Sequence, residues 1–274
     1  MGKISDALEK HKKENPLGNK PVSLKTIERL IPDSQEVIGA KEIVGGSRFS
    51  NKLVAINSPN SIEAEKFKRL RAEVLFARDR KRPRIIMVTS AFANEGKTYV
   101  SSNLAASIAL GIEEYVLLID CDLRRPNIHN LMGYTNNEGL HEYLIGKRFL
   151  SELIIRTKLP KLSVLLAGSN PPNPTEILSS SKMENFLEEV KTRYNDRFII
   201  IDTTPCQATA ETNILAKFVD AIIFVVMSQK TPMAAIKNSI QKLEKEKILG
   251  IVFNGYQQIH SEYGSYYKDY YNMS

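Results

Sequence analysis

Short apolar runs alternate with helix-prone segments from about residue 84 to residue 254. Each run of apolar, often β-branched residues predicts a strand, and such runs stand at 84–89, 115–120, 162–166, 198–202, 221–227 and 248–254. Helices are predicted between them, at 97–110, 182–194 and about 232–247. Strands that are apolar on both sides predict a parallel sheet covered by helices on both faces. The expected fold class is therefore α/β, with a doubly wound, mainly parallel sheet.

The chain before this alternation lacks a regular pattern of that kind. Residues 5–14 predict a short amphipathic helix. Scattered Pro, Gly and Ser without a period predict a flexible linker at 15–50. Ser61 predicts the start of a helix that runs to about Arg80. We therefore expect an N-terminal helix (1–14), a linker (15–50), one α/β domain (51–255) and a C-terminal tail (256–274).

Composition and charge narrow the class of protein. Of the 274 residues, 42% are hydrophobic and 25% are charged, which is typical of soluble globular proteins. No apolar run approaches the roughly 20 residues that cross a bilayer. The two cysteines, Cys121 and Cys206, are far apart, which argues against a disulfide framework or zinc site and fits a reducing cytosol.

The net charge of +7 is concentrated in one stretch. Residues 63–84 carry nine basic and four acidic side chains, a local excess of five. Such a stretch can bind nucleic acid, anionic lipid or an acidic protein surface, or it can be an ordinary solvated helix face. Aromatic residues are not interleaved with the basic ones, and no known nucleic-acid module is present, so we expect no nucleic-acid partner.

A phosphate-binding loop is predicted between the first strand and the helix that follows it. Residues 90–98 fit the pattern G-x-x-x-x-G-K-[ST], with Ala91 in place of the first glycine. Lys97 would face the β- and γ-phosphates of ATP and Thr98 would offer its hydroxyl to Mg²⁺, whereas an ordinary strand–helix turn is the alternative. The predicted nucleotide contacts are Ala93, Asn94, Glu95, Gly96, Lys97, Thr98 and Tyr99.

Acidic residues stand at the ends of two further strands. Asp120 and Asp122 follow the second strand, and Asp202 ends the fourth. Ligands of parallel sheets bind at the carboxyl ends of strands, so these carboxylates can face the metal-bound phosphates. We expect Thr98, Asp120 and Asp202 to hold Mg²⁺, which needs only one or two carboxylates. The alternative is that these acids cap the helices that follow them.

These motifs together resemble the bacterial tyrosine kinases (BY-kinases) of capsule and exopolysaccharide systems, in their stand-alone cytoplasmic form. The resemblance spans about residues 55–274 and includes the phosphate loop, residues 120–126, residues 168–178, the strand end at Asp202 and a tyrosine-rich tail. It implies that Lys97, Asp120, Asp122 and Asp202 are catalytic, with Asp120 the candidate base. It also implies that Asn254 contacts the adenine side of ATP, although an exposed polar strand cap is an alternative.

The last twelve residues hold five of the eleven tyrosines. They show no period of a core strand or helix, so a tail that delivers phenols to another subunit's active site is expected. A sticky aromatic tail for protein contact is the alternative. The expected phospho-acceptors are Tyr263, Tyr266, Tyr267, Tyr270 and Tyr271.

The resemblance further implies partners. The family forms rings through Glu-x-x-Arg-x-x-Arg, which here is Glu65, Lys68 and Arg71; lysine keeps the charge of the middle arginine but loses its fork. A membrane-anchored polysaccharide co-polymerase would activate the kinase and recruit it from the cytoplasm to the inner face of the cell membrane. A cognate tyrosine phosphatase would reset the tail. The kinase would thereby regulate polymerisation and export of the polysaccharide.

Two rival functions remain open at this point. Partition and division-site ATPases have a related loop with a second, signature lysine, but the corresponding residue here is Phe92. A non-catalytic, nucleotide-dependent regulator of polysaccharide assembly is the other rival, and the intact Lys97, Thr98, Asp120 and Asp202 argue against it.

Overall fold

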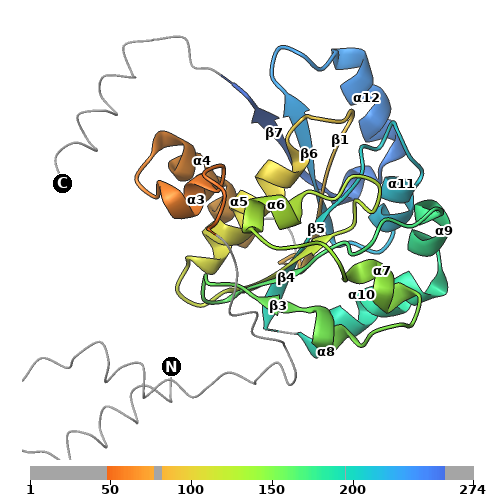
Figure 1. Cartoon of the computed structure of the whole chain (residues 1–274). Coiled ribbons are helices and arrows are strands. Elements are labelled where there is room, and N and C mark those ends of the chain that lie inside the picture. Colours follow the sequence, from red (N-terminus) through yellow and green to blue (C-terminus); the bar gives the residue numbers. More distant parts are fainter. Residues whose placement is uncertain (1–47, 77–81, 195, 257–274) are drawn as a thin grey trace, which may run out of the picture. The chain divides into compact units, whose positions relative to one another are not determined.

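A single sheet with helices on both sides organises the computed structural model, which describes residues 48–76, 82–194 and 196–256 (Figure 1). Its seven strands lie in the order β3-β4-β2-β5-β1-β6-β7. All neighbours are parallel except β3 and β4. The strands are β1 (Ile85–Ser90), β2 (Tyr115–Asp120), β3 (Ile155–Arg156), β4 (Leu162–Leu165), β5 (Arg197–Asp202), β6 (Ala221–Met227) and β7 (Ile248–Asn254).

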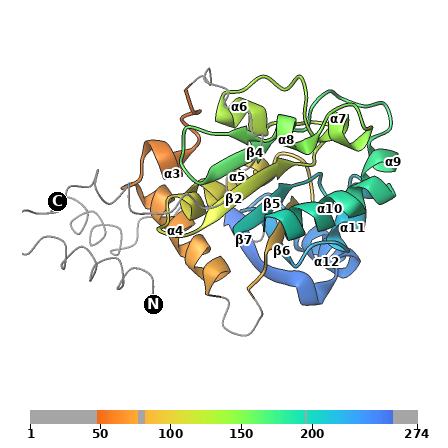
Figure 2. The same cartoon turned by 90° about the horizontal axis from the view of Figure 1, so that it is seen from below.

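The helices divide between the two faces of the sheet. Figure 2 shows α3, α4 and α5 on one side and α10, α11 and α12 on the other. The helices are α3 (Val54–Asn57), α4 (Ile62–Leu75), α5 (Lys97–Ala109), α6 (Ile128–Met132), α7 (Leu140–Leu144), α8 (Leu150–Leu153), α9 (Pro174–Leu178), α10 (Ser181–Arg193), α11 (Glu211–Ala216) and α12 (Met233–Lys242). A 3₁₀ turn, η1 (Lys245–Lys247), precedes β7.

The predicted fold class is confirmed, and all six predicted strands are present to within a residue at either end. Burial explains why these runs are apolar, because every residue of β1, β4 and β5 is buried. The structure adds β3, a strand of two residues that the pattern was too short to reveal. It also ends the last predicted helix at Lys242 rather than near residue 247.

Helix α5 lies against the centre of the sheet and is buried along most of its length. Small side chains such as Ala105 and Ser102 allow this close approach, because they leave room for neighbours on all sides. Helix α4 packs on α5 from outside. It begins as predicted at Ser61, whose hydroxyl accepts a hydrogen bond from the Ala64 N–H at 3.1 Å.

The described part of the chain starts slightly before the expected domain boundary. Phe49 packs against the core, and the Ser50 N–H donates to the carbonyl of Leu131 at 2.9 Å. The predicted N-terminal helix, most of the predicted linker and the tyrosine-rich tail lie outside the described residues.

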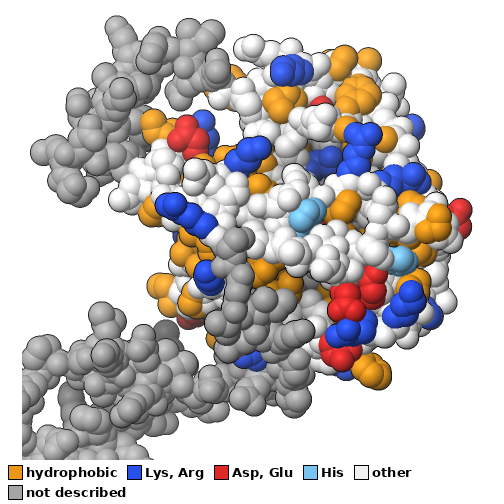
Figure 3. All heavy atoms as spheres, in the orientation of Figure 1, with side chains coloured by type: hydrophobic (Ala, Val, Ile, Leu, Met, Phe, Trp, Pro, Cys, Tyr) orange, Lys and Arg blue, Asp and Glu red, His pale blue; other side chains and the backbone are white. Residues whose placement is uncertain are grey.

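No helix in residues 48–76, 82–194 and 196–256 is long and apolar enough to cross a membrane. On the face drawn in Figure 3, Lys and Arg side chains are spread among polar and hydrophobic ones. Two arginines of the basic stretch 63–84 have partners within this chain. Arg82 pairs with Glu114 at 3.1 Å, and Arg84 donates to the carbonyl of Tyr194. These contacts favour the interpretation as an ordinary solvated surface.

Candidate active site

The strand order places the predicted site residues at one edge of the sheet. Strand β5 lies between β2 and β1, and the phosphate loop follows β1. In the register, Asp202 of β5 stands beside Asp120 of β2 on one side and beside Val88 of β1 on the other. Three segments that are distant in the sequence therefore end together, as expected for a ligand site in a parallel sheet.

The phosphate loop is held in a tight, partly left-handed conformation. Gly96, immediately before α5, has a φ of 91°, which glycine adopts without strain. Asn94 has a φ of 64°, a conformation that asparagine tolerates better than most residues. The Ser90 hydroxyl donates to the carbonyl of Phe92 at 2.7 Å. Such left-handed residues are typical of loops that gather N–H groups around an anion.

Three side chains that we call the Glu95 brace (Glu95, Thr231 and Asn254) tie this loop to the ends of β6 and β7. The Glu95 carboxylate is buried, and it accepts hydrogen bonds from the Phe92 N–H at 2.8 Å and from the Thr231 hydroxyl. The Glu95 carbonyl accepts from Asn254 Nδ2 at 2.9 Å. The acidic side chain thus supports the loop from within.

We expect the substitution Thr231→Val to weaken nucleotide binding by roughly five- to 150-fold, because a buried acceptor that loses its donor costs about 1–3 kcal/mol. Valine keeps the shape of threonine but leaves the Glu95 carboxylate with one donor fewer. Calorimetric titration with Mg-ADP measures the effect. Thr231→Ser is the matched control and should bind like the wild type; equal affinity in Thr231→Val would contradict a supporting role for the brace.

A cleft of about 830 Å³ opens over the phosphate loop, a volume within the usual range of small-molecule sites. Six of the predicted nucleotide contacts line it: Ala93, Asn94, Gly96, Lys97, Thr98 and Tyr99. Asp122 lines it as well. The side chain of Glu95 is directed into the loop, so a nucleotide contact through its backbone N–H stays a prediction. The structure therefore brings one predicted carboxylate and most of the predicted loop residues into a single cavity.

Asp120 is completely buried at the end of β2, and backbone N–H groups occupy both of its oxygens. Oδ1 accepts from the Asp122 N–H at 3.2 Å, and Oδ2 accepts from the N–H groups of Asn127 and Ile128 at 3.1 Å each. Burial, followed by the nearby charge of Asp202, raises the pKa of Asp120 well above its usual range. These bonds anchor the turn after β2.

Asp202 has the opposite character, because both of its oxygens are buried and neither completes a hydrogen bond within the described residues. Burial raises the pKa of Asp202 to about 7. The nearby Thr98 hydroxyl and Lys97 ammonium oppose that rise in pKa. A buried carboxylate without partners is costly unless a cation accompanies it.

The unpartnered carboxylate of Asp202 fits a divalent cation. A cation beside Asp202 would give its orphaned oxygens a partner and relieve the repulsion between Asp202 and Asp120. Within the described ranges, no group of three or more His, Cys, Asp or Glu side chains could hold a metal alone. Magnesium would therefore need the Thr98 hydroxyl, phosphate oxygens or waters to complete its octahedron, as it usually does.

Asp122 is placed differently from the other two acids. It is partly exposed, lines the cleft and accepts a hydrogen bond from the Arg125 N–H through Oδ1 at 2.9 Å. Its carboxylate is therefore the one of the three acids that is both fixed and open to a bound substrate.

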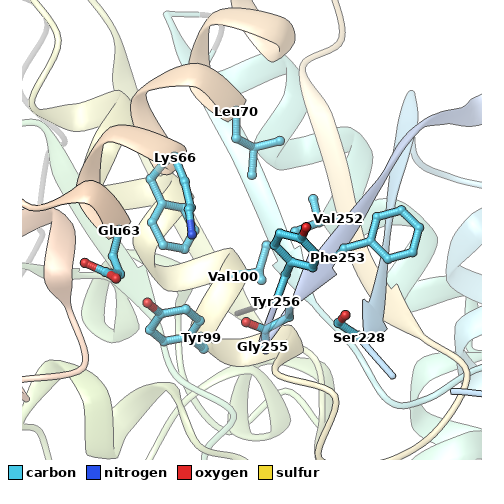
Figure 4. Close-up of a pocket in the computed structure, with 12 residues that line it drawn as sticks. Glu63, Lys66, Leu70, Tyr99, Val100, Ser228, Val252, Phe253, Gly255 and Tyr256 are labelled. Atoms are coloured by element: carbon cyan, nitrogen blue, oxygen red, sulfur yellow. The ribbon is translucent and has the colours of Figure 1, made fainter. Parts of the chain in front are cut away.

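Asn254 ends β7 and contacts the phosphate loop directly. Besides the bond to the Glu95 carbonyl, its amide lies over Gly96, so closely that a Cβ on Gly96 would overlap it. Asn254 also borders a second cleft, of about 890 Å³, between α4, α5 and β7 (Figure 4). Tyr99 borders both clefts, and apolar groups such as Val100 and Leu70 face the second one. The predicted adenine contact stays a prediction.

The residues predicted for ring formation have partners within this chain. Lys68 pairs with Glu65 at 3.2 Å along α4, and Arg71 donates to the carbonyl of Ser107 in α5 at 2.8 Å. Their contact with another subunit stays a prediction. The five predicted acceptor tyrosines lie outside the described residues.

Comparison with known proteins identifies the family. An AAA-domain family model matches residues 83–249. Tyrosine-protein kinase YwqD of Bacillus subtilis is 34% identical over 224 residues, which cover 81% of this chain and 93% of YwqD. The chain belongs to the bacterial tyrosine kinase family.

Two solved structures with the same fold agree with this assignment. The kinase domain of Escherichia coli tyrosine kinase ETK has a TM-score of 0.68 and 32% identity, and the match covers 78% of this chain and 86% of that domain. The chimeric protein CapA2B2 has a TM-score of 0.70 and 30% identity, with 80% and 96% covered. The predicted resemblance and enzyme class, a protein-tyrosine kinase with a P-loop fold, are thereby confirmed.

Sequence reasoning about this bacterial tyrosine kinase missed four residues at the site: Arg124, Thr175, Glu211 and Thr231. Arg124 and Thr175 lie inside the segments 120–126 and 168–178 that carry the family resemblance, and that was the signal available for them. Glu211 and Thr231 belong to no motif. Their roles depend on contacts between loops that the sequence does not place together.

Proposed function

We propose that this protein transfers the γ-phosphoryl group of Mg-ATP to tyrosine hydroxyls, chiefly those of its own tail and in trans. The observation that carries the proposal is the cleft over the phosphate loop. Its lining combines the loop residues with the partly exposed carboxylate of Asp122, and Asp202, whose buried oxygens have no hydrogen-bond partner among the described residues, ends the neighbouring strand β5. That set can hold a metal-bound triphosphate and still leave one carboxylate free for an acceptor.

In the proposed mechanism, Lys97 and the loop N–H groups bind the β- and γ-phosphates and oppose the charge that develops during transfer. Thr98 and Asp202 would hold Mg²⁺, which would neutralise phosphate charge when bound, and the predicted third ligand, Asp120, would act through its charge because backbone N–H groups occupy both of its oxygens. The tyrosine oxygen forms a bond to the γ-phosphorus while the bond from that phosphorus to the bridging oxygen breaks, and ADP leaves. The phenolic proton passes to a carboxylate.

Asp122 is the better candidate for that carboxylate than Asp120, which the sequence alone favoured. Asp120 already accepts three backbone hydrogen bonds and is inaccessible. Asp122 accepts one from Arg125 and lines the cleft, so a free lone pair can reach an acceptor hydroxyl. A positioned base is useful because the pKa of a free tyrosine is about 10.

Changing all five tail tyrosines (Tyr263, Tyr266, Tyr267, Tyr270 and Tyr271) to Phe should remove most autophosphorylation while nucleotide binding persists, because the described site contains none of them. The purified protein is incubated with Mg-ATP, and phosphotyrosine is located by mass spectrometry. Phosphate on the wild-type tail supports the proposal. Persistent phosphotyrosine in the five-fold variant would show that the acceptors lie elsewhere, and an unlabelled wild type would refute tyrosine transfer.

The resemblance supports a wider role, which is also part of the proposal. The kinase would work with a membrane-anchored polysaccharide co-polymerase, be recruited by it from the cytoplasm to the inner face of the membrane, and control capsule or exopolysaccharide assembly. Ring formation through Glu65, Lys68 and Arg71 would bring tails to neighbouring active sites, and a tyrosine phosphatase would reverse the modification. Co-purification with the co-polymerase from membranes would test the recruitment.

A further inference from the structure

Three side chains from one turn and two helices meet beside the cleft, in a cluster that we call the Arg124 clasp (Arg124, Thr175 and Glu211). Arg124 Nε donates to Glu211 Oε1 at 2.8 Å, and Arg124 Nη2 donates to the Thr175 hydroxyl at 3.1 Å. That hydroxyl in turn donates to the same Glu211 oxygen at 2.8 Å. Arg124 comes from the turn after β2, Thr175 from α9 and Glu211 from the first turn of α11.

Burial makes this cluster more than a surface ion pair. Glu211 is 1% exposed, and its second oxygen, Oε2, has no hydrogen-bond partner within the described residues. The Arg124 side chain is 47% exposed, so it stands between the buried acid and the cleft, which it also lines. Because an uncompensated buried carboxylate strongly destabilises a fold, Glu211 holds Arg124 in place and leaves it little freedom to swing toward phosphate.

The clasp fixes the middle of a turn whose ends are already fixed. Asp120 holds the N–H groups of Asp122 at one end and of Asn127 and Ile128 at the other. Between them, Arg124 is attached by its side chain to α9 and α11. The Asp122 carboxylate lies two residues from this attachment and accepts the Arg125 N–H. Its direction toward the cleft therefore depends on a turn secured at three points.

We propose that Arg124, held by Glu211 and Thr175, is a positioning residue that sets the Asp122 carboxylate for phosphoryl transfer without binding nucleotide itself. This inference rests on the proposed function, because Asp122 is the base assigned there. The proposal assigns different roles to the two clusters beside the cleft. The Glu95 brace supports the phosphate loop and hence nucleotide affinity, whereas the Arg124 clasp supports the acceptor side and hence the rate of transfer.

Two mild substitutions test the proposal in the full-length chain. Arg124→Lys keeps a positive charge beside Glu211 but lacks the planar fork that reaches both partners. Thr175→Val keeps the shape and removes the bridging hydroxyl. For Arg124→Lys we expect kcat for tyrosine phosphorylation at saturating Mg-ATP to fall about tenfold or more, with a smaller fall for Thr175→Val. The Kd of Mg-ADP should stay within about twofold of the wild type, because the phosphate loop is untouched.

Hydrogen–deuterium exchange gives a readout that does not depend on activity. In both variants the peptide covering residues 121–128 should exchange faster, while the peptide covering residues 90–98 should not change. Thr175→Ser should restore both exchange and kcat. Arg193→Lys is the matched control, because Arg193 also pairs with a glutamate, at 3.0 Å, but lies on α10.

The outcomes separate the possibilities. A fall in melting temperature with unchanged kcat and unchanged exchange at 121–128 would overturn the proposal and leave the clasp a structural contact. A loss of Mg-ADP affinity as large as the loss of kcat would instead make Arg124 a nucleotide ligand and would also overturn it. If the wild type phosphorylates no tyrosine, the proposed function fails on its own, and faster exchange at 121–128 still reports whether the clasp positions the turn.

Discussion

Lys97→Met should reduce phosphotyrosine formation by roughly 10²–10³-fold or more, because it removes a fixed positive charge that would face the phosphates during transfer. The Lys97 side chain is buried, where its charge is worth more than in solution. Methionine has a similar length and fills the same space. Phosphotyrosine is measured by mass spectrometry after incubation with Mg-ATP, at equal protein concentration.

The fold should survive this change. Within the described residues, no hydrogen bond to Lys97 Nζ is present, so its removal orphans no neutral donor or acceptor. Asp202 loses a nearby positive charge, and its pKa, already raised by burial, should rise further. A melting temperature within a few degrees of the wild type is the control. Wild-type labelling in a folded Lys97→Met protein would mean that the lysine does not act on the transferred phosphate.

Gly96→Ala should weaken Mg-ADP binding about a hundredfold, which corresponds to a loss of about 3 kcal/mol. Two physical effects combine there. A φ of 91° is strained for alanine by roughly 1–2 kcal/mol, and the new Cβ would lie 3.1 Å from Asn254 Cγ and still closer to Nδ2. The loop must move to relieve both, and its N–H groups then lose their alignment with phosphate.

Gly250→Ala is the matched control, because a Cβ there meets no atom within 4 Å. It should bind Mg-ADP like the wild type. The double variant Gly96→Ala/Asn254→Ala relieves the overlap but keeps the backbone strain and loses the Asn254 hydrogen bond to the Glu95 carbonyl, so affinity should recover only in part. The single variant Asn254→Ala measures the loss of that hydrogen bond alone. If Gly96→Ala bound nucleotide as tightly as the wild type, the phosphate-loop assignment would be wrong.

The fold class and the phosphate loop that lines the cleft could be predicted from the sequence because their signals are local. A strand buried on both faces must be apolar throughout, so runs such as that of β5 reveal themselves without knowledge of their neighbours. The phosphate loop is equally local, since Gly96, Lys97 and Thr98 are consecutive. Acids at strand ends could be placed near the loop because the carboxyl ends of parallel strands share one edge.

The roles of individual site residues were harder to predict from the sequence, because they depend on which side-chain atoms already take part in hydrogen bonds. Asp120 and Asp122 are equivalent in sequence terms, and only the backbone N–H groups gathered around Asp120 distinguish an anchor from an accessible carboxylate. Similarly, Glu95 was expected to contact nucleotide. The donors that draw its carboxylate into the loop include Thr231, 136 residues away.

By itself, then, the sequence determined a parallel α/β sheet, a phosphate loop and the acidic strand ends. Strand burial and phosphate-loop chemistry each require particular residue types at consecutive positions, so both can be recognised in a short stretch of sequence. The tertiary structure alone decided how those parts are held. The Glu95 brace and the Arg124 clasp both arise from hydrogen bonds between segments that the fold brings together. Such bonds join residues that are far apart in the chain, so no local pattern records them.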